Sequence, residues 1–270
     1  MSACGRAGEW QLALEVMKQA RERGLRPTRV TYNTAISACA KGGEADRAVE
    51  LLEEMRNHAG LTPNSISFNS AISACAGKGQ WKRALSLLSE MESSGDVGVS
   101  PDEFSYSSVI TACGRGRQWS KAVELLDTMR GQGISPGVFS FNAAITACGE
   151  AGQWERAVGL LREMEAGTVG PDTVSFNAAI KACSDAGQWQ RALGLLAEMQ
   201  RNQRGRRRKP PGPLPDVVSY STAIVACSRA GNWERVLDLL EKMQGSGVAP
   251  NATTFTAAIG ACKKGAAEEQ

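Results

Sequence analysis

The sequence predicts an all-α fold, a right-handed α-solenoid (superhelix) of stacked helical hairpins, with the handedness taken by analogy with known helical arrays. The first observation is a period: eight cysteines recur every 35 to 44 residues, at Cys4, Cys39, Cys75, Cys113, Cys148, Cys183, Cys227 and Cys262. Six copies carry Trp six residues after the Cys, and six carry Met sixteen residues after it. Self-similarity at such a period indicates a repeat array.

The second observation is a pair of apolar stripes at helical spacing in each copy, seen clearly in residues 138–172. The stripes are Phe141, Ala144, Ile145 and Cys148, followed by Trp154, Ala157, Val158 and Leu161. Ser140 is a candidate N-cap of the first helix, and Gly149 and Gly152 bracket the turn. Gly167 with Pro171 ends the second helix. Because one hairpin cannot bury both stripes, neighbouring copies must stack.

The copies tile the chain as a single array over residues 1–270. The expected repeats are 1–28 (partial), 29–64, 65–102, 103–137, 138–172, 173–216, 217–251 and 252–270 (partial). The longest copy contains an insert at 201–215, where an arginine cluster is followed by four prolines that cannot continue a helix. We expect a mobile loop there, either a basic arm that contacts phosphate or carries a targeting signal, or a solvated insertion.

Charge alone does not identify a partner. The net charge is +3, but six of the 31 basic residues lie in the insert, which leaves 25 basic residues against 28 acidic ones. The distribution of charge over one face must therefore carry any argument for nucleic acid.

Several classes of protein are excluded. No apolar run has the length needed to span a bilayer, so no membrane association is expected. No C-x-x-C pair is present, and the Cys, Trp and Met ladders are interpreted as core, so neither a metal nor a cofactor is expected. The lone His58 is interpreted as a surface residue. No deaminase signature and no nucleophile with a base is found, so the chain is not expected to be an enzyme.

The repeated motif V-[ST]-[YF]-N-x-A-I-x-A-C-x-x-x-G-x-W-x-x-A-x-x-L-L-x-x-M, most often ending in G-x-x-P-[DN], resembles the pentatricopeptide repeat over the whole chain. The tetratricopeptide repeat differs by its W-x-x-L-G-x-x-Y opening, which is absent. The resemblance implies a sequence-selective single-stranded RNA-binding protein. Such a protein uses one repeat for each base, in organellar RNA processing, stability or translation, and carries out no chemistry of its own.

Two polar positions per repeat are the candidate base-reading residues. The first follows the aromatic residue and is rotated about 100° away from it on the helix, out of the core stripe. It is occupied by Asn33, Asn69, Ser107, Asn142, Asn177, Ser221 and Thr256. The second follows the repeat-ending proline and is occupied by Asn64, Asp102, Gly137, Asp172, Asp216 and Asn251. Asp and Asn after Pro also suit a helix N-cap, so capping remains an alternative role for the second set.

The resemblance also implies a base for each repeat. From Asn33 with Asn64 to Ser221 with Asn251, the pairs imply C (or U), U, a purine, U, U and A, running 5′ to 3′ along the chain. Gly137 departs from the pattern because it lacks a second reading side chain, and relaxed specificity is expected there.

Two further sets are assigned by resemblance. Residues that wedge between successive bases are Val30, Ile66, Phe104, Phe139, Val174 and Val218, with Thr253 in the last copy. Residues that contact phosphate are Arg6, Lys41, Arg115, Arg229 and Lys264. The same position holds Gly77, Glu150 and Asp185 in other copies, so we expect modest affinity with a shallow salt dependence through the middle of the array.

Two other interpretations remain open, a tetratricopeptide-like scaffold for protein interactions and the RNA-targeting part of a longer editing or cleavage enzyme. The start looks cut, so a transit peptide upstream is compatible with the sequence. The family suggests mitochondrion or plastid as the location. A half-repeat at each end, with Phe255, Ile259 and Cys262 lacking a neighbour at the C-terminal one, predicts fraying or end-to-end self-association.

Overall fold

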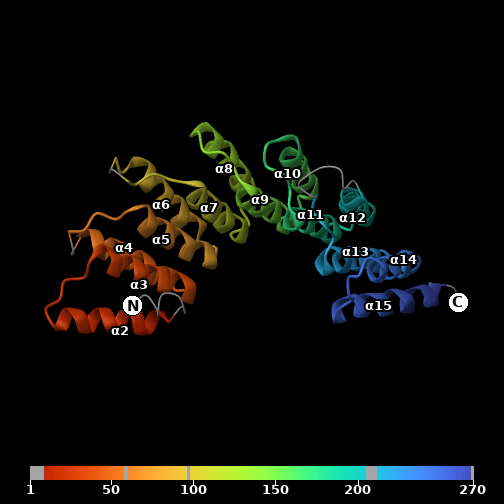
Figure 1. Cartoon of the computed structure of the whole chain (residues 1–270), viewed down its shortest axis with the longest axis horizontal. Helices are drawn as coiled ribbons and strands as arrows, with labels where there is room; N and C mark the ends of the chain where they lie inside the picture. Colours follow the sequence, from red (N-terminus) through yellow and green to blue (C-terminus); the bar gives the residue numbers. More distant parts are fainter. Residues whose placement is uncertain (1–8, 58–59, 96–97, 205–211, 269–270) are drawn as a thin grey trace. The chain divides into compact units, whose positions relative to one another are not determined.

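The computed structural model describes residues 9–57, 60–95, 98–204 and 212–268, which form helices and their connections with no strand among them (Figure 1). The chain divides into two compact units, Met1–Pro136 and Gly137–Gln270, called here the N-terminal unit and the C-terminal unit. Arg6, His58 and most of the insert at 201–215 lie outside the described residues, as does the side chain of Lys264.

Each unit is a row of helical hairpins. The N-terminal unit contains α2 (Trp10–Glu22), α3 (Arg29–Gly42), α4 (Ala45–Asn57), α5 (Ser65–Lys78), α6 (Trp81–Ser93), α7 (Glu103–Arg115) and α8 (Trp119–Gly131). The C-terminal unit contains α9 (Val138–Glu150), α10 (Trp154–Ala166), α11 (Thr173–Asp185), α12 (Trp189–Arg204), α13 (Val217–Arg229), α14 (Trp233–Gly245) and α15 (Ala252–Glu268). The odd-numbered helices from α3 to α15 are called first helices, and the even-numbered ones second helices.

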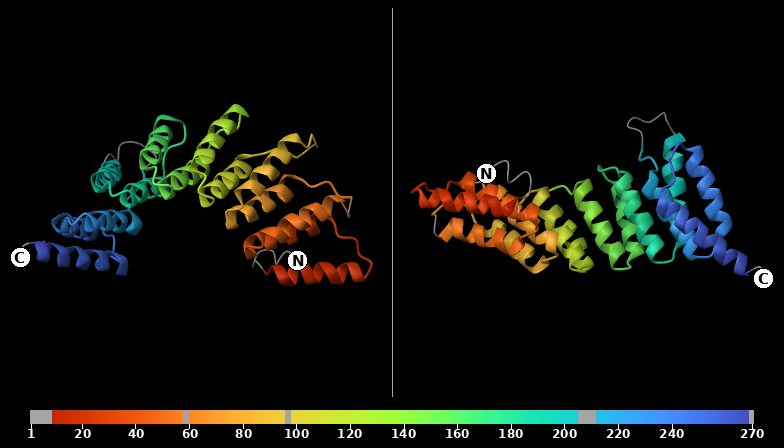
Figure 2. Two further views of the ribbon diagram at one scale, coloured as in Figure 1. Left: turned by 180° about the vertical axis from the view of Figure 1, so that it is seen from behind. Right: turned by 90° about the horizontal axis from the view of Figure 1, so that it is seen from below.

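Within each unit the first and second helices form separate layers, and the hairpins follow one another in chain order (Figure 2). Consecutive first helices contact each other: α3 with α5 and α5 with α7 in one unit, and α9 with α11, α11 with α13 and α13 with α15 in the other. Second helices pack on the first helices of their own and the following hairpin. The predicted all-α stack of hairpins is confirmed in each unit.

Small side chains allow the first helices to approach closely. The cysteines from Cys39 to Cys227 are fully buried with neighbouring alanines. A Cβ atom added to Gly149 of α9 would lie 2.9 Å from the Cβ atom of Ala182 on α11, closer than real contacts allow. Burial raises the pKa of the Cys148 thiol to about 11, with Arg156 opposing the shift, so this thiol stays protonated and apolar at neutral pH.

The aromatic and methionine ladders are core, but the tryptophan ladder is not. Tyr32, Phe176 and Met164 are almost completely buried, as are their counterparts in the other internal repeats. The tryptophans are only half-buried, so the expectation that they lie hidden between layers is wrong. Each Trp is the first residue of its second helix, where one side of the ring remains open to solvent. The ring of Trp81 covers Gly116, whose added Cβ would lie 2.2 Å from Trp81 Cδ1.

The residue after the repeat-ending proline is the N-cap of the first helix in each repeat from α3 to α13. The side chains of Thr28, Asn64, Asp102, Asp172 and Asp216 cap helices α3, α5, α7, α11 and α13, and each is paired with a Ser or Thr three residues later in a capping box. Gly137 starts α9 without a side-chain cap. Ser140 is therefore not an N-cap. It lies inside α9, because the chain turns into the helix directly after the proline.

Arginine–glutamate pairs bridge neighbouring second helices. Arg21 of α2 pairs with Glu54 of α4, and Arg56 of α4 pairs with Glu90 of α6. Arg162 of α10 holds Glu198 of α12 through two nitrogens, at 2.6 and 2.8 Å. These bridges restrain neighbouring second helices relative to each other.

The last helix lacks a covering hairpin among the described residues. Phe255 is 48% exposed and Ile259 is 57% exposed, and Cys262 is also exposed, whereas the same positions in preceding repeats are buried. Over the described part of the chain, no helix combines the length and the apolar character that a membrane crossing requires.

One turn residue carries backbone strain. Most hairpins place a glycine at positive φ between their helices, such as Gly152 at 74°, but the α7–α8 hairpin places Arg117 there, at a φ of 58°. A side chain in this left-handed region is strained by about 1 kcal/mol or more, and the exposed Arg117 side chain makes no described contact that offsets the strain.

We therefore expect Arg117→Gly to stabilise the protein by about 1 kcal/mol and to raise the thermal midpoint by about 2 to 4 °C, measured by circular dichroism. Gly152→Ala is the matched control. It introduces a side chain at positive φ with no atom within 4 Å, so it should destabilise by a similar amount. A midpoint that stays unchanged or falls in Arg117→Gly would contradict the strain argument.

Candidate nucleic-acid interface

An exposed apolar side chain recurs at the second residue of successive first helices. The set, called here the apolar row, consists of Val30, Ile66, Phe104, Phe139, Val174 and Val218, with exposed fractions between 53% and 79%. Three members lie in each unit, and Thr253 takes the position in α15. A single exposed apolar residue needs no explanation, but its recurrence at one helix position within each unit makes the row a candidate for contact with apolar or aromatic groups.

The candidate base-reading residues lie one helical turn after the apolar row, on the same face. Asn33, Asn69, Ser107, Asn142 and Asn177 are half-buried, which leaves part of each polar group accessible. Ser221 is the exception, with only 7% of its surface exposed, and Thr256 on the terminal helix is exposed.

Four of the expected pairs are joined directly by a hydrogen bond between side chains. Each Asn Nδ2 donates to the Oδ1 atom of the post-proline residue that begins the next first helix. The bonds are Asn33 to Asn64 at 3.2 Å, Asn69 to Asp102 at 3.2 Å, Asn142 to Asp172 at 3.2 Å and Asn177 to Asp216 at 3.1 Å. The fold therefore brings together residues 30 to 39 positions apart in the sequence.

The other pairs differ. Ser221 reaches Asn251 only through Thr254, whose Oγ1 lies 2.8 Å from both Ser221 Oγ and Asn251 Oδ1. Ser107 and Gly137 belong to different units, and the hydroxyl of Ser107 donates to the carbonyl of Phe104 at 3.1 Å.

Capping and pairing coexist in the post-proline residues, so the capping alternative left open by the sequence is realised without excluding a second role. In Asp216, Oδ1 accepts from the backbone N–H of Ser219 at 2.9 Å and from Asn177. The backbone N–H of Val218 also interacts with this carboxylate.

The hydrogen bonds to these caps stabilise the charged carboxylate. Burial acts to raise the pKa of Asp216, but hydrogen bonds from Ser219 and Asn177 outweigh it and hold the pKa below its usual value. Burial also acts to raise the pKa of Asp172, but hydrogen bonds from Ser175 and Asn142 outweigh this effect, and the pKa of Asp172 is lowered as well. Both groups therefore present negative charge at neutral pH.

The basic residues predicted to contact phosphate are partly engaged within the protein. Arg115 donates to the carbonyls of Ala76 at 3.2 Å and Gly77 at 2.7 Å, where it caps the end of α5. Arg229 pairs with Asp185 at 3.0 Å. Lys41 is exposed.

Asp185 does not act as the isolated carboxylate expected from the sequence. Asp185 forms ion pairs with both Arg229 and Lys181, so its negative charge is balanced. The expectation that Asp185 presents an unpaired negative charge to phosphate is therefore wrong. Burial acts to raise the pKa of Asp185, but the hydrogen bonds from these two cations lower it overall. Glu150 remains exposed and has no cation within ion-pair distance in the described part of the chain.

Apart from the helix cap expected at Ser140, the serine or threonine before each aromatic residue was not assigned a role from the sequence. Ser67, Ser105, Ser175, Ser219 and Thr254 are completely buried and contact the reading residues or their caps. The sequence signal that could have identified them is the Ser or Thr that occupies this position in every copy of the motif. Helical periodicity alone shows only that the position lies in a helix.

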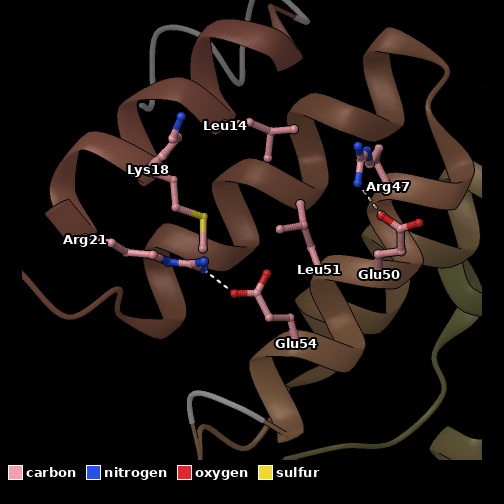
Figure 3. A pocket seen from close by; sticks show the side chains of 8 residues that line it. Leu14, Lys18, Arg21, Arg47, Glu50, Leu51 and Glu54 are labelled. Atoms are coloured by element: carbon pink, nitrogen blue, oxygen red, sulfur yellow. Dashed lines mark hydrogen bonds and ion pairs between the residues drawn. The ribbon is translucent and has the colours of Figure 1, made fainter.

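A small pocket between α2 and α4 belongs to the second-helix layer (Figure 3). It is lined by Leu14, Met17, Lys18, Arg21, Arg47, Glu50, Leu51 and Glu54. The Arg21–Glu54 ion pair joins α2 to α4 across it, and the Arg47–Glu50 pair lies along α4, so most of its charges are paired with each other. No residue of the apolar row lines it, and it is separate from the candidate interface.

Models of one repeat family match most of the chain. The model described as the PPR repeat family matches residues 27–77, 63–115, 101–148 and 215–264. A pentatricopeptide repeat domain model matches residues 1–42, and a PPR repeat model matches residues 139–167 and 174–203. The chain belongs to the pentatricopeptide repeat family. A search of curated proteins gives no significant match.

Solved pentatricopeptide repeat structures share the fold. The crystal structure of PPR10 from maize matches with a TM-score of 0.55 and 21% identity, over 95% of this chain and 40% of that chain. PPR10 in complex with an 18-nt psaJ RNA element gives 0.52 and 22%, over 92% and 39%. The PPR domain of Arabidopsis thaliana protein-only RNase P 1 in complex with tRNA gives 0.51 and 20%, over 64% and 88%. The chain thus spans about two fifths of the length of PPR10.

The lowered pKa of Asp216 predicts an acid-dependent contribution to the stability of the pentatricopeptide array. Because Asp216 is more acidic in the folded state, its contribution is complete above the unfolded pKa of about 4 and is lost as pH falls through the folded pKa. Asp216→Asn keeps the cap but removes the charge. It should cost about 0.5 to 1.5 kcal/mol in urea unfolding at pH 7, and the difference should shrink below pH 4.

Glu53→Gln is the control, because Glu53 is an exposed carboxylate on α4 with no hydrogen-bond partner in the described residues. It should leave the urea midpoint unchanged at both pH values. A cost of Asp216→Asn that is the same at pH 7 and pH 3 would show that charge does not contribute.

Proposed function

We propose that the chain is a sequence-selective single-stranded RNA-binding protein in which each repeat addresses one base. The observation that carries the proposal is the apolar row, which lies one turn from a polar pair on each of several successive first helices. Bases have flat faces that stack on exposed apolar or aromatic side chains, and polar edges that amide and carboxylate groups can distinguish. An apolar contact and a polar reader at fixed spacing fit a single strand better than a paired helix, whose bases are not accessible.

The expected register places C or U, U, a purine, U, U and A on the pairs from Asn33 with Asn64 to Ser221 with Asn251. Asn69, Asn142 and Asn177, each bonded to an aspartate, are the three pairs assigned to U. The weakest selectivity is expected where Gly137 supplies no side chain and where the hydroxyl of Ser221 is already bonded to Thr254.

Comparison with solved proteins supports the same class of ligand. PPR10 was solved with an RNA element, and the PPR domain of protein-only RNase P 1 was solved with tRNA. We place the protein in a mitochondrion or plastid on the basis of its family. There it would act in RNA processing, stability or translation by occupying or presenting its site, without chemistry of its own.

Competition between two oligonucleotides tests base selectivity. The protein should bind CUAUUA more tightly than a scrambled sequence of the same composition in a filter-binding assay. Asn142→Ala and Asn177→Ala should each reduce that preference by about fivefold or more, because a truncated reader leaves the base edge without its partner. Asn57→Ala, an exposed residue at the end of α4, should have no effect. Equal binding of both oligonucleotides would favour a scaffold for protein interactions.

A second test concerns the apolar row. Phe139, with 79% of its surface exposed, should contribute stacking to any base, so Phe139→Ala is expected to weaken binding of both oligonucleotides by about fivefold to 100-fold. Leu237→Ala is the control, because Leu237 is 41% exposed on second helix α14. If both variants bind like the original chain, the apolar row is not a stacking surface.

A further inference from the structure

A closed set of hydrogen bonds surrounds the reading asparagine at three repeat boundaries. At the α5–α7 boundary, Asn69 Nδ2 donates to Asp102 Oδ1 at 3.2 Å, and the backbone N–H of Ser105 donates to the same oxygen at 2.8 Å. The backbone N–H of Asp102 donates to Ser105 Oγ at 3.1 Å. The hydroxyl of Ser105 lies 2.5 Å from Asn69 Oδ1.

The hydroxyl proton of Ser105 has two acceptors within reach, Asn69 Oδ1 and Asp102 Oδ1, the latter at 2.9 Å. Two oxygens as close as 2.5 Å require a hydrogen between them, because otherwise their lone pairs repel. The proton therefore goes to Asn69. The amide is then held at both of its atoms, with Nδ2 bonded to Asp102 and Oδ1 bonded to Ser105.

The same arrangement occurs at two other boundaries, one in each unit. Ser67 Oγ lies 2.6 Å from Asn33 Oδ1, and Ser219 Oγ lies 2.6 Å from Asn177 Oδ1. All three serines are completely buried, so water does not compete for these bonds.

The α9–α11 boundary lacks this contact. Ser175 is equally buried and takes part in the same capping box, but its hydroxyl bonds to Asp172 Oδ1 at 2.8 Å and not to Asn142. Asn142 Oδ1 is buried without a hydrogen-bond partner. The chain thus contains an internal comparison between serines that hold the reading amide and one that only caps a helix.

Holding both atoms of the amide determines how it can read a base. A planar amide fixed at one atom pivots about that contact, whereas an amide fixed at two atoms presents its remaining N–H and its remaining lone pair in one orientation. Uracil offers a carbonyl acceptor and an N–H donor on its pairing edge, and cytosine offers an amino donor and a nitrogen acceptor at the corresponding places. A fixed amide fits one of these edges, and a pivoting amide can fit both.

We infer that Ser67, Ser105 and Ser219 are positioning residues that set base discrimination by the preceding repeat, through their hydroxyl bonds to Asn33, Asn69 and Asn177. The inference rests on the proposed RNA-binding function and extends it, because each base is then selected by residues from two consecutive repeats. The serine does not touch the base, and it acts only through the asparagine.

The test measures discrimination at single bases by filter binding. For Ser105, the ratio of dissociation constants for CCAUUA and CUAUUA reports the base assigned to Asn69. The ratio for CUAUCA and CUAUUA reports the base assigned to Asn177. Ser105→Ala should reduce the first ratio by about threefold to tenfold and leave the second unchanged. Ser105→Thr retains the hydroxyl, as Thr31 and Thr254 do at the same position, and should keep both ratios.

Ser175→Ala is the matched control, because it removes an equivalent cap partner that does not contact Asn142. The ratio for CUACUA and CUAUUA, which reports the base assigned to Asn142, should not change. Helix content by circular dichroism should match that of the original chain in every variant.

The outcomes separate the inference from the function on which it rests. If the original chain binds all the oligonucleotides equally, the proposed function and this inference both fall. If the original chain discriminates and Ser105→Ala discriminates equally at the Asn69 base, the inference alone is overturned. It is also overturned if Ser105→Ala loses discrimination at both bases, because that result shows a general structural effect.

Discussion

The N-cap side chains of α5, α7, α11 and α13 each serve two helices at once, and the candidate interface depends on this double role. Asp102, Asp172 and Asp216 accept hydrogen bonds from the first turn of their own helix and from the asparagine of the preceding one. Helix capping satisfies backbone groups that would otherwise lack partners, so the fold requires a polar residue there in any case. A structural requirement thus places a carboxylate beside the reading amide at these three boundaries.

Close contact between first helices makes this double role geometrically possible. Alanine and cysteine are buried along the first helices, and the approach of Gly149 to Ala182 leaves no room even for a methyl group at that position. Second helices carry larger residues and are joined by ion pairs such as Arg162 with Glu198. Because the first helices lie closer together than the second helices, polar groups on adjacent first helices come within hydrogen-bond distance.

Much of the candidate interface follows from position along the helix. A residue that follows a buried aromatic turns away from the core stripe, so the partial exposure of Asn33 and of its counterparts other than Ser221 could be predicted. The apolar row could be named from the family motif. The burial of Ser105 and its contact with Asn69 could not be predicted, because a serine in a helix gives no periodic signal. The engagement of Arg229 with Asp185, 44 positions earlier, also depends on which residue the next helix brings near.

The sequence by itself determined the period, the two helices of each repeat and the face that each helix buries, because these follow from side-chain spacing within a dozen residues. The tertiary structure decided which hydrogen-bonding groups are already used, which arginines are paired and how far the tryptophans are covered. The physical reason is that hydrogen bonds and ion pairs depend on separations of a few tenths of an ångström between atoms on different helices. Residues 30 to 44 positions apart acquire such separations only when the hairpins stack.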